Sequence, residues 1–189
     1  MILPVYIIGH PILRRISQPV PEDMEGLNSL LTDMWETMYK IDGVGLAAPQ
    51  IGKNLRIFVI DASVYAEDDP SLTDFKKAFI NAEILDYSGE PYPDGEGCLS
   101  IPGINEDVIR PESVTISYQD EEFKWHEDTF SGRAARIVQH EYDHLEGKLF
   151  VDKLNPIRRR LLTSQINSIS KGKTPVRYKV VLPSSRKKA

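Results

Sequence analysis

The chain has 189 residues, of which 41% are hydrophobic, so it is long enough to form one domain with a buried core. Its 13 Pro and 12 Gly are ordinary totals, which argues against a collagen-like or wholly disordered chain. No apolar run approaches the ~20 residues that span a bilayer, and the first residues, MILPVYIIGHPIL, show neither a basic leader nor a cleavage site of small residues. We therefore expect a soluble, cytoplasmic protein that does not contact a membrane.

The net charge of −5 hides an asymmetry along the chain. Residues 153–189 contain eleven Lys and Arg and no Asp or Glu, which leaves 12 basic against 28 acidic residues in 1–152. The first part therefore sums to −16 and the second to +11. The basic segment is either a binding surface for a partner of opposite charge or a solvated tail that balances the acidic part.

The first predicted element is a helix over residues 27–41, LNSLLTDMWETMYKI, in which apolar side chains recur every three or four residues. Gly43 follows it as a terminator. The run LRIFVID, residues 55–61, predicts a short buried strand, and a polar loop over 62–74 follows it. Three further segments are predicted as strands, the last two forming a hairpin: 76–89, 113–120 and 121–132.

Two more helices are expected in the second half of the chain. One begins near Ser131, a good N-cap residue, and stops at Gly147. Asn155, followed by a proline, caps a last helix that Gly172 closes. The apolar stripe of this last helix is predicted to consist of Ile157, Leu161, Ile166 and Ile169. The segment 177–181, RYKVV, is expected to add an edge strand, and the final residues are expected to be mobile.

The stretch QHEYDHLEG places two of the four histidines of the chain four residues apart. Residues i and i+4 project from one face of a helix, so His140 and His144 can bind one metal ion. Glu141 lies beside the same ion, where it can move a proton without being a ligand. The simpler alternative is an exposed helix that carries two solvated histidines. The other histidines, His10 and His126, are better explained as structural or surface residues.

A catalytic ion commonly has three protein ligands and one open position, so a third ligand is needed. The best candidate is Cys98, in DGEGCLSIPG, where glycines let the backbone approach another surface. A lone cysteine is more often a buried small apolar side chain, but a divalent ion would hold its sulfur as thiolate. With no second cysteine for a disulfide, the chain also fits a reducing compartment.

A second unusual stretch is GVGLAAPQIG, residues 43–52. Its glycines and alanines suit a place where the backbone lies close to a ligand, and the neutral amide of Gln50 can donate a hydrogen bond there. The alternative is a tight connection between helix 27–41 and strand 55–61, in which Gln50 bonds a loop carbonyl.

GVGLAAPQ, EGCLS and QHEYDHLEG occur in the order, and at about the separations, that characterise peptide deformylases, and the chain resembles this family from HPIL to about Asp152. The resemblance implies an α+β fold with antiparallel β-sheets packed around a central HExxH-bearing helix, plus an N-terminal and a C-terminal helix. It implies hydrolysis of the formyl group from N-formylmethionyl nascent peptides, with release of formate. Residues 1–152 would form the catalytic metallohydrolase domain, with 153–189 as an attached basic helix and tail.

The matching motifs also imply the roles of individual residues. The implied metal ligands are Cys98, His140 and His144. Glu141 would be the general acid/base for a metal-bound water, and Gln50 with the backbone N–H of Leu99 would polarise the formyl carbonyl. The family implies Fe(II) as the native ion, with Ni(II), Co(II) or Zn(II) as substitutes; the thiolate ligand favours ions that expand readily to five ligands.

An apolar pocket for the methionine side chain is expected beside the metal. Ile137, one helical turn before His140, and Val44 would line it. Gly43, Gly45 and Gly97 would leave room for the extended substrate backbone. Two residues of this wall depart from the aliphatic side chains common in the family: Arg133 and Arg136.

The basic segment suggests a macromolecular partner. Its predicted helix carries Arg158, Arg159 and Arg160, which could contact phosphates of ribosomal RNA, so we expect the ribosome as a possible partner and neither DNA nor a membrane.

Two other functions compete with deformylation. A zinc endopeptidase would need a third His or Glu ligand downstream, but no histidine follows His144, and EGCLS would have no role. A metal-stabilised ribosome-binding protein without catalysis would be expected to have lost Glu141 or Gln50, and both are present.

Overall fold

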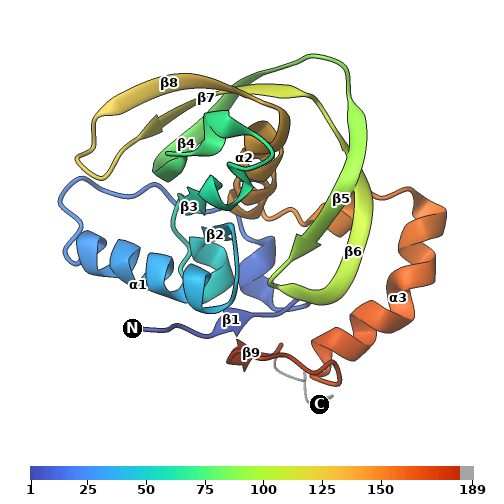
Figure 1. Cartoon of the computed structure of the whole chain (residues 1–189). Helices are drawn as coiled ribbons and strands as arrows, with labels where there is room; N and C mark the ends of the chain where they lie inside the picture. Colours follow the sequence, from blue (N-terminus) through green and yellow to red (C-terminus); the bar gives the residue numbers. More distant parts are fainter. Residues whose placement is uncertain (184–189) are drawn as a thin grey trace.

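The structure, a computed structural model, describes residues 1–183 and has the mixed helix and antiparallel-sheet architecture that the sequence predicts. Its main sheet has five antiparallel strands in the order β2-β3-β4-β7-β8 (Figure 1). These strands are β2 (Gly45–Ala47), β3 (Ile57–Asp61), β4 (Lys76–Ser88), β7 (Ser113–Gln119) and β8 (Trp125–Ser131). The expected mobility of the final residues concerns 184–189, which lie outside the described residues.

Two smaller pairs of strands complete the β-structure. One is a long hairpin of β5 (Tyr92–Cys98) and β6 (Ile101–Arg110), which the sequence did not predict. The other is a short parallel pair of β1 (Val5–Tyr6) and β9 (Val180–Val181), so the predicted strand at 177–181 does form, over its last two residues.

Three α-helices surround and fill this framework: α1 (Leu27–Lys40), α2 (Gly132–Leu145) and α3 (Pro156–Ser170). Helix α2 is central, between the main sheet and the β5–β6 hairpin (Figure 1). Its apolar face, with Ala135 and Val138, packs on a cluster that includes the stacked rings of Phe58 and Phe79. Because this apolar face packs on the main sheet, the other face of α2 is turned toward the hairpin.

The other two helices pack on separate apolar clusters. The face of α1 that is buried against β2 and β3 contains Leu27, Leu30, Leu31, Met34 and Met38. Helix α3 packs on the hairpin through Leu162, Ile166 and Ile169. The predicted stripe of α3 is therefore wrong at Ile157 and Leu161, which are 77% and 68% exposed. Positions 162, 166 and 169 are four and three residues apart and form the face of the helix that meets the hairpin. Ile157 and Leu161 lie outside this face.

Helix α2 begins where the sequence predicts, but the expected hydrogen bond from its N-cap side chain is absent. Ser131 is the N-cap residue, but its hydroxyl pairs with Ser113 of β7 at 2.9 Å and makes no capping bond to the helix. The helix therefore continues directly from β8, and this junction orients α2 across the sheet. None of the helices among residues 1–183 combines the length and apolarity needed to cross a membrane.

Candidate metal centre

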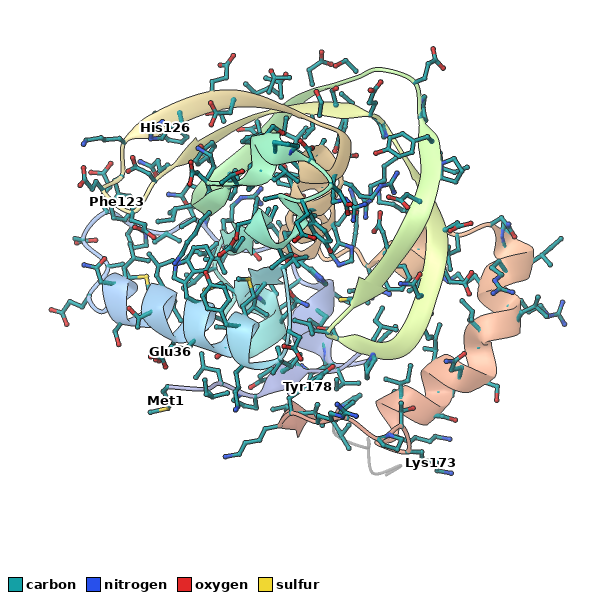
Figure 2. All side chains as sticks on the ribbon, in the orientation of Figure 1. Met1, Glu36, Phe123, His126, Lys173 and Tyr178 are labelled. Atoms are coloured by element: carbon teal, nitrogen blue, oxygen red, sulfur yellow. The ribbon has the colours of Figure 1, made fainter. Side chains whose placement is uncertain are left out.

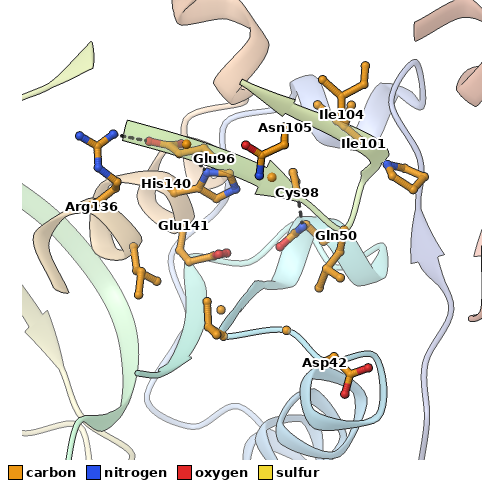
Figure 3. Close-up of a pocket in the computed structure, with 18 of the residues that line it drawn as sticks. Asp42, Gln50, Glu96, Cys98, Ile101, Ile104, Asn105, Arg136, His140 and Glu141 are labelled. Atoms are coloured by element: carbon orange, nitrogen blue, oxygen red, sulfur yellow. Dashed lines mark hydrogen bonds and ion pairs between the residues drawn. The ribbon is translucent and has the colours of Figure 1, made fainter. Parts of the chain in front are cut away.

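Three side chains from two separate elements converge beside α2. Cys98 ends strand β5, and His140 and His144 lie one turn apart on α2. One ligand atom from each of the three lies within 4.8 Å of the others, so a single ion could contact all three. Figure 3 shows two of them, Cys98 and His140, at the cavity. Cys98 Sγ lies 3.4 Å from His144 Nε2. The structure thus brings together the three ligands that the sequence analysis expects.

The donor set fits a divalent transition-metal ion. One thiolate and two imidazoles are ligands of the kind that bind zinc and iron in proteins, and three of them leave a fourth position open. The ring nitrogen Nδ1 of His140 is occupied by Glu96 at 2.8 Å, which leaves Nε2 for an ion. His144 is 1% exposed. The neighbouring residues therefore leave these donors available to an ion.

Glu96 is the centre of a buried ionic network that supports His140. Its two carboxylate oxygens accept from Arg110 Nε at 2.5 Å and Nη2 at 2.9 Å, and from Arg136 Nη1 at 3.0 Å. A second bond from Arg110 reaches Asp143 on α2 at 2.8 Å. Burial alone would raise the pKa of Glu96, but the hydrogen bonds from His140 and Arg110 lower it to about 2. Glu96 therefore stays a carboxylate and holds the His140 ring in one orientation.

Glu141 lies on the same helix face, next to the ligands, and is 5% exposed. One of its oxygens, Oε2, is buried without a hydrogen-bond partner among the described residues. Desolvation by burial raises its pKa to about 7. The close approach depends on Gly45 of β2, because a Cβ there would lie 2.8 Å from Glu141 Cδ. A buried carboxyl group with a pKa near neutrality can both accept and return a proton.

Gln50 faces the centre from the opposite side, in the short 3₁₀ helix η2 (Ala48–Ile51). Its Oε1 accepts from the Ala47 N–H at 2.8 Å, which turns Nε2 toward Cys98 Sγ, 3.5 Å away, and Ser100 Oγ, 3.3 Å away. Leu99 and Ser100 form the tip of the β5–β6 hairpin. No acceptor among the described residues is paired with the Leu99 N–H. Two hydrogen-bond donors therefore lie near Cys98. The Gln50 amide is held by hydrogen bonds, and the Leu99 N–H has no acceptor among the described residues.

A cavity of about 550 Å³ opens beside these groups. Every residue that the sequence analysis expects at the substrate pocket lines it: Gly43, Val44, Gly45, Gly97 and Ile137. Both departures from the family pattern also line it. Arg136 is drawn into the Glu96 network, whereas Arg133 lies over the ring of Tyr65, 4.3 Å from the ring centroid.

Several lining residues were missed by the sequence analysis. Ile101, Ile104 and Asn105 come from β6, whose hairpin was not predicted, and Tyr178 comes from the segment after α3. The two remaining histidines lie elsewhere, as expected. His10 accepts from the Ile12 N–H, and the exposed His126 pairs with Asp120.

Comparison with known proteins gives one consistent answer. A family model described as polypeptide deformylase matches residues 2–160. A peptide deformylase from Christiangramia forsetii is 45% identical over 99% of this chain and 99% of that protein.

Solved structures agree with the sequence relatives. A peptide deformylase from Legionella pneumophila superposes with a TM-score of 0.79 at 38% identity, covering 93% of this chain and 100% of that one. One from Thermus thermophilus gives a TM-score of 0.81 at 36% identity, covering 92% and 100%. The resemblance seen in the sequence is thereby confirmed, and the chain belongs to the polypeptide deformylase family of metal-dependent hydrolases.

Proposed function

We propose that this protein removes the formyl group from formyl-methionine at the start of nascent polypeptides and releases formate. The observation that carries the proposal is the convergence of Cys98, His140 and His144 at a cavity that also contains the buried carboxyl group of Glu141. Family membership supports the reaction, and the geometry supports the assignment of roles to these residues.

The three converging side chains would hold the ion. Bound there, a divalent ion would lower the pKa of water to around 7 and polarise the formyl carbonyl. We expect Fe(II) in the cell, as the resemblance to the family implies. The donor set alone does not select one ion, so we also expect Ni(II), Co(II) or Zn(II) to act as substitutes.

Glu141 would transfer the proton. Water forms a bond to the formyl carbon while Glu141 accepts one of its protons, and the C–N bond then breaks as that proton passes to the leaving amine. Formate and a free N-terminal amine are the products. Burial and the raised pKa of Glu141, about 7, suit this exchange near neutral pH.

Gln50 and Leu99 would stabilise the negative charge that develops on the formyl oxygen. The Gln50 amide is held by its bond to Ala47, and the Leu99 N–H has no competing acceptor among residues 1–183. Donors fixed in this way need no reorganisation during the reaction, and removal of one typically costs ~2.7 to 4 kcal/mol. The substrate backbone would lie along Gly43, Gly45 and Gly97, with the methionine side chain against Val44 and Ile137.

The test is release of formate from formyl-Met-Ala-Ser under anaerobic conditions, with metal content measured in the same samples. Glu141→Gln should keep the metal and lose most turnover, while Cys98→Ala should lose both. Glu127→Gln, on the exposed strand β8, is the matched control and should behave as wild type. A Glu141→Gln variant with normal turnover would refute the role of Glu141. Wild-type protein that holds Fe(II) but releases no formate would favour the non-catalytic ribosome-binding protein, and cleavage within the peptide would favour an endopeptidase.

We further propose that the basic C-terminal segment docks on the ribosome. Arg158 and Arg159 are already paired, with Glu106 and Asp152, whereas Arg160 and the two lysines at 171 and 173 line one exposed surface hollow and have no ion-pair partner among the described residues. Replacement of these three by Gln should weaken ribosome binding and flatten its dependence on salt. Binding that is unchanged by the triple replacement would contradict the proposal.

A further inference from the structure

The cavity includes a residue from the C-terminal segment, beyond the part of the chain that the family model matches. Tyr178 lines the cavity, although the matched region ends at residue 160. Its hydroxyl donates to the carbonyl of Leu99 at 2.7 Å. Leu99 is the residue whose N–H we propose as a donor to the substrate oxygen, so the contact links the C-terminal segment to the reacting groups.

The tip of the β5–β6 hairpin needs support from outside. Cys98 pairs with Ile101, so Leu99 and Ser100 form a two-residue connection. Such connections usually adopt turns that place one or both residues at positive φ, because those turns match the twist of the strands. Neither Leu99 nor Ser100 has a positive φ. The tip therefore lacks the turn geometry that two-residue hairpins favour.

Bonds from other segments hold the tip on two sides. The Ile8 N–H donates to the Ser100 carbonyl at 2.9 Å, and Gln50 Nε2 contacts Ser100 Oγ at 3.3 Å. Only the Tyr178 hydroxyl holds the Leu99 carbonyl among the bonds of the described residues. That carbonyl shares a peptide plane with the Ser100 N–H, so the bond restrains the backbone on the C-terminal side of Leu99.

Tyr178 is itself fixed by the N-terminal segment that carries Ile8. The Val5 N–H donates to the Lys179 carbonyl at 2.9 Å, and β1 pairs with β9 immediately after Tyr178. The short N-terminal segment 5–8 thus bonds to the C-terminal segment through β1 and to the hairpin tip through Ile8. Figure 2 shows Tyr178 between β9 and this tip. Desolvation by burial and the nearby Cys98 raise the pKa of Tyr178 to about 12, so the phenol keeps the proton that it donates.

From these contacts we infer that Tyr178 is a positioning residue, whose hydroxyl fixes the Leu99 backbone so that its N–H is aimed at the substrate oxygen. The inference rests on the proposed function, since it assigns Tyr178 a part in the same reaction. Residues 153–189 then contribute to the catalytic site in addition to carrying the basic charge. A truncation at Lys153 would remove Tyr178, so it could not separate ribosome docking from catalysis.

Tyr178→Phe is the sharpest test, because it keeps the ring at the cavity wall and removes only the hydroxyl. The kcat for formyl-Met-Ala-Ser should fall about three- to tenfold, the range for one ordinary hydrogen bond, with KM within about twofold of wild type. Tyr178→Leu also removes the ring and should raise KM as well. Tyr118→Phe, which loses a hydroxyl bond to Asp128 and does not line the cavity, is the control and should leave kcat unchanged.

Amide hydrogen exchange gives a readout that does not depend on turnover or on metal. In Tyr178→Phe, exchange at the Ile8 amide, which donates to the Ser100 carbonyl of the tip, should speed up at least threefold, with no change in the middle of β7. If the variant only lowers Tm, with kcat and exchange at Ile8 as in wild type, the hydroxyl serves stability alone and the inference is wrong. If wild-type protein released no formate, the proposed function would fail, and the exchange comparison would still decide whether Tyr178 holds the tip.

Discussion

Replacement of Glu96 by Gln probes the buried network that supports the metal centre. Glu96 is 5% exposed and accepts hydrogen bonds from Arg110, Arg136 and His140. The change removes its charge and turns one acceptor oxygen into a donor that faces other donors. Arg110 keeps Asp143, but a buried guanidinium loses its main partner. Removal of one member of a buried ion pair typically costs about 3 to 5 kcal/mol of unfolding free energy.

The pKa of Glu96 gives a second value for the unfolding free energy that this network contributes. It lies at about 2 in the folded protein, against a usual value of 4.5. At about 1.4 kcal/mol per pKa unit, this difference corresponds to roughly 3 kcal/mol. Since the folded pKa is the lower one, this stability is fully present above pH 4.5 and is lost as the pH falls from 4.5 toward 2. The difference between wild type and Glu96→Gln should therefore shrink in acid.

Urea unfolding of the metal-free proteins at pH 7 and pH 3 measures both effects. The control is Glu106→Gln, which makes the same chemical change at the residue paired with Glu96 across the hairpin. Glu106 accepts two hydrogen bonds from Arg158, whose side chain is half-exposed, so the loss of unfolding free energy in this variant should be well below that of Glu96→Gln. The reasoning would be refuted if Glu96→Gln stayed within about 1 kcal/mol of wild type at pH 7, or if the difference persisted unchanged at pH 3.

Three further predictions concern the site and the C-terminal helix. Gly45→Ala should lower kcat at least tenfold with metal content unchanged, because the new methyl group displaces Glu141; normal formate release would contradict this. Chelation should abolish formate release and lower Tm, and Fe(II), Ni(II) or Co(II) should restore both; activity that persists in metal-free protein would exclude a metal mechanism. Asn155→Ala removes the N-cap bond to the Arg158 N–H and should cost about 1 kcal/mol in urea unfolding without altering kcat; an unchanged midpoint would show that the cap is unimportant.

The elements with a clear hydrophobic period were predictable. Helix 27–41 and the strands at 55–61, 76–89 and 113–120 form within a few residues of their predicted bounds. The β5–β6 hairpin was not predictable in this way, because YPDGEGC has two glycines, a proline and two acidic residues and shows no alternation. Its strands form through their mutual pairing and through the packing of β6 on α3, which are contacts between distant parts of the chain.

The same limit explains the error in α3. Apolar residues with helical spacing occupy two faces of this helix, and the sequence does not say which face meets the hairpin. Only the tertiary contact selects Leu162 and leaves Leu161 exposed. Local periodicity therefore predicts that a helix forms, while the orientation of the helix depends on its neighbours.

Within the site, the predictable part was the chemistry that local motifs carry. The i and i+4 spacing of the histidines predicts one ion, the glycines before Cys98 make it the best candidate for a third ligand, and the resemblance to the family implies the same residue. Glu96 was missed, although it lies two residues before Cys98 in the same strand, where side chains of i and i+2 point to the same face. That periodicity could have identified it. Nothing in the local sequence marks Tyr178, because its role depends on the pairing of β1 with β9.

The two imidazoles that we propose as metal ligands are held by different means, and this has a measurable consequence. The His140 ring is oriented by the bond of its Nδ1 to Glu96, whereas His144 Nδ1 is buried without a partner among the described residues, so that ring is held by packing and by the contact of its Nε2 with Cys98 Sγ. Glu96→Gln should thus weaken metal binding through His140 only, by the ten- to hundredfold typical of such supporting partners. Competition with a chelator measures this loss, and the Glu106→Gln control should show none. Equal affinity in both variants would mean that packing orients His140 too, and that the buried charges serve only to hold the hairpin against α2.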